Sequence, residues 1–257
     1  MYRFYYESEN KTDKNIVVAG EDAHHIKNVL RLKIGEKLIL CDGNGYEHLC
    51  TVADYDTQNA VNCEIIESRE SETELPVKIV LYQGLPKKDK LELIIQKAVE
   101  LGAFEIVPVA MKRSIAKIED DKSEKKKMQR WQEIARAAAK QSERGIIPQV
   151  GKCLTFKQAL QRCTEDKALI CVAYENARGM SSLAEFAQAV KEAPKGATIA
   201  VFVGPEGGFE ESEVEMVKEN GGLSVSLGKR ILRTETAGLT LLSILMYELE
   251  TNNGMLS

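Results

Sequence analysis

The stretch ATIAVFVGPEGGF, residues 197–209, combines an apolar run with a glycine-rich turn. A short apolar run bounded by turn residues is typical of a buried strand, here 197–203. The turn at 204–208 follows the carboxyl end of that strand, where open α/β sheets bind their ligands. Glycines at such a place let the backbone approach a flat ligand closely. The stretch therefore predicts a buried strand that leads into a candidate binding turn.

On both sides of this stretch, strands alternate with helices from Pro76 to the end of the chain. The expected strands are 77–83, 105–109, 168–173, 197–203 and 223–227, and the expected helices are 87–101, 123–144, 182–191, 212–220 and 236–250. Such alternation predicts a mainly parallel sheet covered by helices, so we expect an α/β domain over residues 73–257.

Residues 1–72 show a different pattern, in which short runs rich in Val, Ile, Leu and Tyr follow one another closely. The expected strands are 2–8, 15–19, 36–41, 46–53 and 60–67, with one short helix at 22–30. The sequence Asp-Gly-Asn-Gly at 42–45 is a hairpin signal, because these residues tolerate positive φ. We expect a small barrel, followed by a polar linker at 68–74.

The composition describes an ordinary globular protein of one large or two smaller domains, with 257 residues, 44% hydrophobic and 29% charged. No apolar stretch approaches the ~18 residues that cross a bilayer, and the N-terminus does not resemble a secretory signal. A cytoplasmic protein without a membrane partner is the default expectation. No two of the six cysteines form a C-x-x-C motif, which predicts structural thiols. The three histidines have no zinc-ligand spacing, so we expect no metal site.

The charge is unevenly distributed along the chain. Residues 73–150 hold 16 basic against 11 acidic side chains, whereas the whole chain has a net charge of −4. A local basic excess fits a positive patch for a phosphate-rich partner. For the run formed by Lys122 and Lys125 to Lys127, a solvated helix face is the alternative that we favour.

A second turn, residues 227–236, follows the strand expected at 223–227 and carries the sequence LGKRILRTET. The chain contains no P-loop, no dinucleotide-binding glycine pattern and no nucleophile elbow. By pattern alone, each glycine turn could be a plain connection between a strand and a helix. Two such turns with an Arg- and Glu-rich segment favour a binding site.

These two turns resemble motifs of the ribosomal RNA small subunit methyltransferase E family, a branch of the SPOUT methyltransferases. The matching residues are Gly204-Pro205-Glu206-Gly207-Gly208-Phe209, Leu227-Gly228-x-x-Ile231-Leu232-Arg233-x-Glu235-Thr236-Ala237, His24-His25-x-x-x-Val29-Leu30-Arg31, Lys97-Ala98-Val99-Glu100-Leu101-Gly102, Arg113-Ser114 and Gln141-Ser142-x-Arg144. The resemblance spans nearly the whole chain.

The resemblance implies a PUA-like β-barrel that binds RNA over residues 1–72 and a SPOUT domain with a trefoil knot over 73–257. It also implies S-adenosylmethionine (SAM) as the cofactor and a homodimer. The activity would be methylation of N3 of uracil-1498 in the 16S rRNA of the 30S ribosomal subunit. Alternatives are another RNA or atom as the target, or an RNA-binding module without catalytic activity.

Within this resemblance, the cofactor-binding residues would come from three loops: Tyr174, Val203, Gly204, Pro205, Glu206, Gly207, Leu227, Gly228, Ile231 and Leu232. Uracil N3 carries a weakly acidic proton, so methylation needs a base or an electrostatic partner. We expect Arg233 or Arg113 to stabilise the charge on the uracil oxygens, and Glu206 or Glu235 to accept the proton. For Glu235 the alternative is a helix N-terminus that simply favours an acidic residue.

The expected RNA contacts are basic side chains of both domains: His25, Arg31, Lys87, Lys88, Lys90, Lys97, Arg113, Arg136 and Arg144. A packed core histidine is the alternative for His25. The helix expected at 236–250 is apolar on most faces, which favours a dimer interface, with a buried core helix as the alternative.

Overall fold

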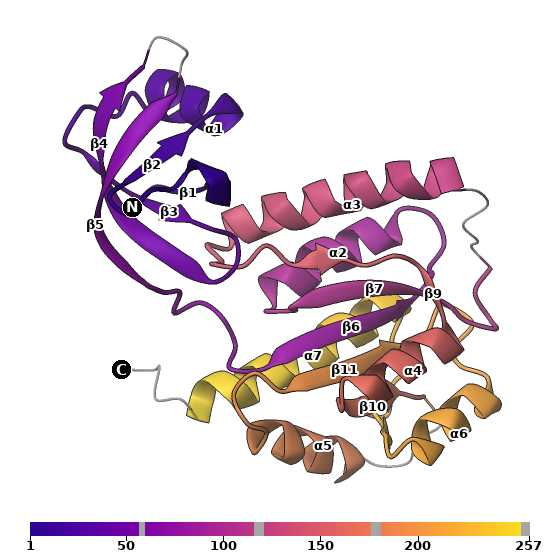
Figure 1. Ribbon diagram of the computed structural model, residues 1–257. Coiled ribbons are helices and arrows are strands. Elements are labelled where there is room, and N and C mark those ends of the chain that lie inside the picture. Colours follow the sequence, from indigo (N-terminus) through magenta and orange to yellow (C-terminus); the bar gives the residue numbers. More distant parts are fainter. Residues whose placement is uncertain (57–59, 116–120, 176–180, 253–257) are drawn as a thin grey trace. The chain divides into compact units, whose positions relative to one another are not determined.

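The computed structural model describes residues 1–56, 60–115, 121–175 and 181–252, and the chain divides into two units. Unit 1 comprises Met1–Glu74 together with Ala139–Ile147, and unit 2 comprises Leu75–Ala138 and the remainder from Pro148 onward (Figure 1). The sequence analysis placed the division at residue 72 and did not foresee that a segment around residue 144 belongs to the first unit.

Unit 1 contains one five-stranded mixed sheet in the order β1-β3-β4-β5-β2. Its strands are β1 Arg3–Tyr5, β2 Asn15–Val18, β3 Lys37–Cys41, β4 Tyr46–Tyr55 and β5 Val61–Glu70. All five expected strands are confirmed. Only β1 and β3 pair in parallel, and the other pairs are antiparallel. Because β5 continues to Glu70, the linker is shorter than the sequence predicts.

The expected helix at 22–30 is α1, Gly20–His24, which continues as a π-helical turn, His25–Val29. A short 3-10 turn, Ser8–Asn10, lies between β1 and β2. The predicted hairpin at 42–45 is present, and Asp42 Oδ1 accepts hydrogen bonds from the backbone N–H groups of Asn44 and Tyr46. The core of the unit is formed by alternate residues of the strands: Phe4, Tyr6, Ile16, Val18, Leu38, Leu40, Cys50, Val52, Val61 and Cys63, with Ala23 and Ile26 from the helical segment.

Unit 2 is a parallel sheet in the order β12-β10-β11-β6-β7-β8, with β9 also paired to β7. Its strands are β6 Lys78–Gly84, β7 Glu105–Ala110, β8 Gln149–Val150, β9 Leu154–Thr155, β10 Leu169–Ala173, β11 Thr198–Val203 and β12 Leu223–Val225. The helices are α2 Lys90–Glu100, α3 Asp121–Gln141, α4 Phe156–Glu165, α5 Ser181–Lys191, α6 Glu211–Glu219 and α7 Thr234–Asn252. The mainly parallel α/β architecture is therefore confirmed.

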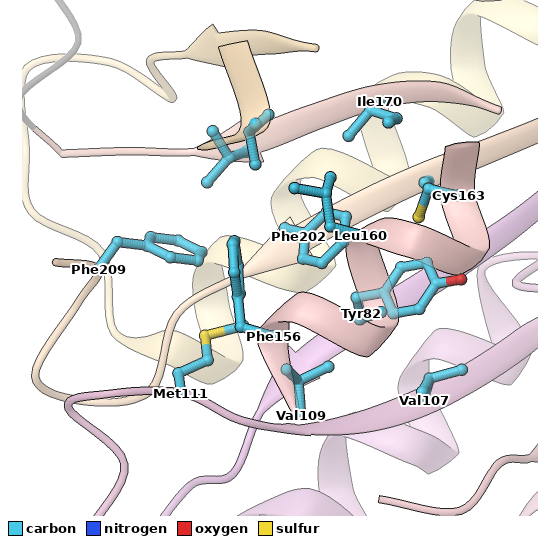
Figure 2. Close-up of a cluster of buried hydrophobic side chains, with 14 of the residues drawn as sticks. Tyr82, Val107, Val109, Met111, Phe156, Leu160, Cys163, Ile170, Phe202 and Phe209 are labelled. Carbon is cyan, nitrogen blue, oxygen red and sulfur yellow. The ribbon is translucent and has the colours of Figure 1, made fainter. Parts of the chain in front are cut away.

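Helices cover both faces of this sheet. Figure 2 shows one face, where Tyr82 of β6 stacks on Phe202 of β11 with ring centroids 4.6 Å apart, and Phe156 of α4 packs against Phe202 and Phe209. Residues of α4 and α6 complete this cluster. The opposite face is covered by α2, α5 and α7, and α7 contacts α2, α5 and β11.

Three elements of unit 2 were missed. The strands β8 and β9 have two residues each, which is too short for a pattern. Helix α4 had a readable signal, because Thr155 and Gln158 form a capping box and Phe156, Ala159, Leu160 and Cys163 form its buried face. The fold now places the ends of β10, β11 and β12 at one edge of the sheet.

Candidate functional site

Two adjoining cavities lie at the carboxyl ends of the parallel strands β10, β11 and β12. The larger has a volume of about 400 Å³ and is lined by the turn after β11, residues 203–209, and by residues 231–234. The smaller, about 90 Å³, is lined by residues 226–232 and by Tyr174. Both cavities share Ala173, Glu175, Ile231, Leu232 and Ala237, so they form one continuous site.

All ten residues expected to bind a cofactor line this site. Val203, Gly204, Pro205, Glu206 and Gly207 line the larger cavity, Tyr174, Leu227 and Gly228 line the smaller one, and Ile231 and Leu232 line both. Sequence reasoning gave no site role to nine others: Ala173, Glu175, Gly208, Phe209, Ser226, Lys229, Arg230, Thr234 and Ala237. Their positions next to the quoted turns were the available signal.

The glycines of the turn after β11 are required by close packing. Gly208 has a φ of +68°, and a Cβ atom there would lie 2.5 Å from Glu175 Oε1. A Cβ atom on Gly207 would lie 2.9 Å from the Cβ of Arg113. Larger residues would displace these side chains, so the turn must be glycine-rich to keep its neighbours in place.

A buried chain of hydrogen bonds fixes the floor of the larger cavity. Gln83, at the end of β6, donates from Nε2 to Thr234 Oγ1 at 2.8 Å. Thr234 in turn donates to the carbonyl oxygen of Gly204 at 2.5 Å. Gln83 is fully buried, and Thr234 begins α7. The chain thus joins a central strand, the glycine turn and the last helix.

The two candidate catalytic carboxylates, Glu206 and Glu235, meet at one ammonium group. Lys90 Nζ lies 3.1 Å from Glu206 Oε1 and 3.3 Å from Glu235 Oε2. Glu206 also accepts a hydrogen bond from the backbone N–H of Lys87. Burial of Glu206 would raise its pKa, but hydrogen bonds from backbone N–H groups and from Lys90 hold that pKa below its ordinary value.

The environment of Glu235 differs from that of Glu206. Glu235 does not line either cavity and lies in the first turn of α7, where the helix dipole favours an acidic side chain. Lys90, expected to contact RNA, lies instead in the lining of the larger cavity as the partner of both carboxylates. The three residues tie the start of α2 to the glycine turn and to α7.

The two candidate arginines have different surroundings. Arg113 donates from Nε to Glu210 Oε1 at 2.8 Å and from Nη1 to the carbonyl oxygen of Gly207 at 3.2 Å. Its pKa is raised by the hydrogen bond to Glu210. Arg233 lines the larger cavity and is exposed, and it makes no ion pair with any residue that the structure describes. Arg233 is therefore the arginine available to a second ligand.

Arg144 is a correction to the expected RNA contacts. Its side chain is 4% exposed, and it pairs with Glu74 with Nη2 2.5 Å from Oε2. A buried guanidinium held by a carboxylate does not reach a phosphate at the surface. Arg144 thus belongs to the core of unit 1.

The other expected RNA contacts lie at or near the surface. In unit 1, His25 and Arg31 are exposed, and the His25 ring packs edge-on against Phe4 with centroids 5.8 Å apart. In unit 2, Lys87, Lys88 and Arg136 are exposed, and half-buried Lys97 pairs with Glu100. The buried histidine of unit 1 is His48, which the sequence analysis did not single out.

All six cysteines are free thiols, five of them buried, which confirms the prediction of structural thiols. Burial raises the pKa of Cys50 and of Cys63 to about 12, so neither thiol ionises readily. Within the described parts of the chain, no three His, Cys, Asp or Glu residues are grouped as a metal site. None of the helices described is long and apolar enough to span a membrane.

Comparisons with known proteins identify the family of both units. Residues 73–246 match the family model of an RNA methyltransferase domain, and residues 18–67 match that of an RNA methyltransferase PUA domain. The ribosomal RNA small subunit methyltransferase E of Bacillus subtilis is 43% identical, with 92% of this chain and 91% of that protein covered.

Two solved structures share the fold and contain SAM. That of a ribosomal RNA small subunit methyltransferase E from Neisseria gonorrhoeae is 31% identical, covers 96% of this chain and 97% of its own, and has a TM-score of 0.78. That of a protein from Legionella pneumophila is 29% identical, covers 95% and 96%, and has a TM-score of 0.72. The PUA-like mixed sheet, the parallel-sheet domain and the sequence matches together show that this chain belongs to the ribosomal RNA small subunit methyltransferase E family.

Proposed function

We propose that this chain is a SAM-dependent methyltransferase that modifies N3 of a single uridine, uracil-1498, in the 16S rRNA of the small ribosomal subunit. The observation that carries the proposal is the continuous site at the ends of β10, β11 and β12, lined by both glycine-bearing turns. Acting on the ribosomal subunit would place the protein in the cytoplasm.

The cavities fit a ligand of the size and chemistry of SAM. About 400 Å³ and 90 Å³ of adjoining space suit a molecule with an extended shape. Glycine at 204, 207 and 228 carries no side chain, so a flat base can approach the backbone of these turns closely. When bound, SAM supplies a methyl group on a positively charged sulfur. The SAM-bound relatives support this assignment.

The residues of the chain then have to make uracil N3 nucleophilic. We propose that Arg233 faces the uracil carbonyl oxygens and stabilises the negative charge that develops when the N3 proton is lost. Arg113, held by Glu210 and the Gly207 carbonyl, instead fixes the turn. A carboxylate with a lowered pKa is a weak base, so we assign Glu206 to positioning. Glu235, paired with Lys90, has the same positioning role, and the proton leaves to solvent.

RNA and a second copy of the chain are the proposed partners. The exposed side chains of His25 and Arg31 in unit 1 and of Lys87, Lys88 and Arg136 in unit 2 are the proposed phosphate contacts. The side chain of Tyr247 on α7 is 64% exposed and that of Leu93 on α2 is 46% exposed, although α2 and α7 contact each other. We propose that this apolar surface is covered in a homodimer, and that the SAM domain contains the trefoil knot.

The test is methylation of 30S subunits that lack the modification, with labelled SAM and the purified protein. A methyl group at N3 blocks Watson–Crick pairing, so reverse transcription should stop at the target uridine only when SAM is present. Label at another position would reject the target but keep the enzyme class. Binding of RNA without binding of SAM would favour the non-catalytic alternative.

A further inference from the structure

Glu175 lies where the two cavities meet. It is the second residue after β10, at the carboxyl edge of the sheet, and it lines both the larger and the smaller cavity. A ligand that extends from one cavity into the other must therefore pass this carboxylate with its middle part, rather than with either end.

The nearby carboxylates all have partners. Glu206 is bound to Lys87 N–H and Lys90, and Glu210 is bound to Arg113. Among the residues that the structure describes, Glu175 makes no hydrogen bond and no ion pair. An ionised carboxylate only accepts hydrogen bonds, so Glu175 is available to a ligand that carries donors.

The glycine turn is shaped around this carboxylate. Gly208 adopts a φ of +68°, and a Cβ atom on it would lie 2.5 Å from Glu175 Oε1 and 3.2 Å from its Cδ. The missing side chain at 208 is what leaves the carboxyl group its space above the turn. The Glu175 carboxylate thus lies directly against the glycine turn.

SAM has adenine at one end, the methionyl group at the other and a ribose with two adjacent hydroxyl groups in between. We infer that Glu175 binds the two ribose hydroxyls of SAM, an inference that rests on the proposed function. Two donors on adjacent carbons match the two oxygens of one carboxylate. Acidic residues bind ribose hydroxyls in the same way in dinucleotide-binding α/β folds.

The experiment is calorimetric titration of the full-length protein with S-adenosylhomocysteine and with 5′-methylthioadenosine, which keeps the ribose but lacks the amino-acid tail. Glu175→Gln should raise the Kd of both ligands about tenfold, the size expected for hydrogen bonds to a charged group. Glu215→Gln, on the exposed side of α6 and paired with Lys218, is the matched control and should leave both values unchanged.

A ligand without the hydroxyls tests the atom assignment. The 2′,3′-dideoxy analogue of 5′-methylthioadenosine should bind the unmodified protein about tenfold more weakly than its parent, whereas Glu175→Gln should bind both equally. Gly208→Ala, which displaces the carboxylate, should weaken the binding of 5′-methylthioadenosine. Adding Glu175→Gln to Gly208→Ala should cause no further loss of affinity.

Three results would overturn the inference. An unchanged Kd for both ligands in Glu175→Gln would show that the carboxylate does not bind the cofactor. If Glu175→Gln raised the Kd of S-adenosylhomocysteine alone, Glu175 would instead bind the amino-acid tail. If removing the two hydroxyls from the ligand weakened binding equally in the unmodified protein and in Glu175→Gln, Glu175 would not be the partner of those hydroxyls. If the unmodified protein binds none of these ligands, the proposed function itself fails, which is a separate outcome.

Discussion

Lys90 Nζ lies 3.1 Å from Glu206 Oε1, so the first residue of α2 is joined to the glycine turn that follows β11. The same ammonium is 3.3 Å from Glu235 Oε2 at the start of α7. One cation therefore lies between two carboxylates and pairs with both of them. Without it, the two like charges would repel and the turn would lose one of its attachments.

Lys90→Met should accordingly raise the Kd for SAM about tenfold, because the turn that lines the larger cavity is no longer held. Lys90→Arg, which keeps the positive charge, should retain most of the affinity. The measurement is calorimetric titration with SAM. If Lys90→Met bound SAM normally and lost only affinity for RNA, Lys90 would be a phosphate contact, as the sequence alone suggested.

Arg233→Gln should lower the methylation rate about 100-fold or more, the range found when a donor to a developing oxyanion is removed. Its Kd for SAM should stay within about threefold of the unmodified protein, because Arg233 is exposed at the larger cavity and does not hold the turn. The acid limb of its pH–rate profile should move to higher pH, since the N3 proton is then lost less readily.

Two control variants test whether these effects are specific to Arg233. Lys218→Gln removes a cation that pairs with Glu215 away from the cavities and should change nothing. Glu206→Gln should leave the acid limb in place, because the pKa of Glu206 is lowered and its role is positioning. A shift of that limb in Glu206→Gln, with none in Arg233→Gln, would identify the carboxylate as the base.

Arg144→Met should destabilise unit 1 by about 3–5 kcal/mol, the cost of leaving one partner of a buried ion pair without the other. The pair has side chains that are 4% and 14% exposed, and Glu74 also accepts hydrogen bonds from the backbone N–H groups of Gly145 and Ile146. Urea unfolding followed by circular dichroism measures the effect. The double variant Arg144→Met, Glu74→Leu should recover part of the loss.

The Arg144 case shows where sequence reasoning stops. All five strands of unit 1 could be read from local apolar runs and turn residues, because those signals are local. That residues 139–147 pack with the first unit depends on contacts such as the hydrogen bond from Tyr5 Oη to the Arg144 carbonyl, 139 positions apart. An arginine at the end of a basic helix looks the same in a sequence whether it is buried or exposed.

The sequence likewise predicts only part of the candidate site. The ten residues predicted to bind the cofactor could be placed at one site because glycine turns at strand ends and a family resemblance point to backbone that the fold must bring together. The ammonium of Lys90 between two carboxylates, and Glu175 above Gly208, depend on side chains of different loops, so no spacing along the chain reveals them. The trefoil knot rests on the resemblance and stays a prediction.

The stability of unit 1 should depend on pH through His48. Its side chain is 4% exposed and bonded to Tyr6 and Ser68, and burial, with a smaller contribution from Lys11, lowers its pKa from 6.5. The folded state thus takes up this proton less readily than the unfolded chain. The contribution of neutral His48 to the stability of unit 1 is complete above about pH 6.5 and is lost as the pH falls towards the lowered pKa.

Melting temperatures of the unmodified protein should therefore decrease as the pH is lowered from 7 to 5, and His48→Gln should show a flatter dependence at a lower overall stability. His24→Gln, an exposed histidine of the same unit, is the control and should keep the slope of the unmodified protein. Parallel slopes in all three proteins would exclude His48 as the titrating group.

Helix α7 leads to the last prediction, which concerns the homodimer. Leu241, Leu242, Leu245 and Leu249 are buried within unit 2, so this face accounts for much of the apolar character of the helix. Tyr247, 64% exposed, is not explained by the fold of one chain. A large aromatic side chain left in water is typical of an interface, where such residues contribute most of the binding energy.

Tyr247→Lys should convert a dimer into monomers in light scattering at micromolar concentration, because a lysine at the centre of an apolar interface would be buried without a partner. Ile66→Lys is the matched control, since Ile66 is 51% exposed on β5 of unit 1 and should not alter the mass. The buried leucines of α7 are untouched, so the circular dichroism spectrum should be preserved. A dimeric Tyr247→Lys protein would show that this side of α7 is not the interface, whereas a monomeric unmodified protein would reject the homodimer itself.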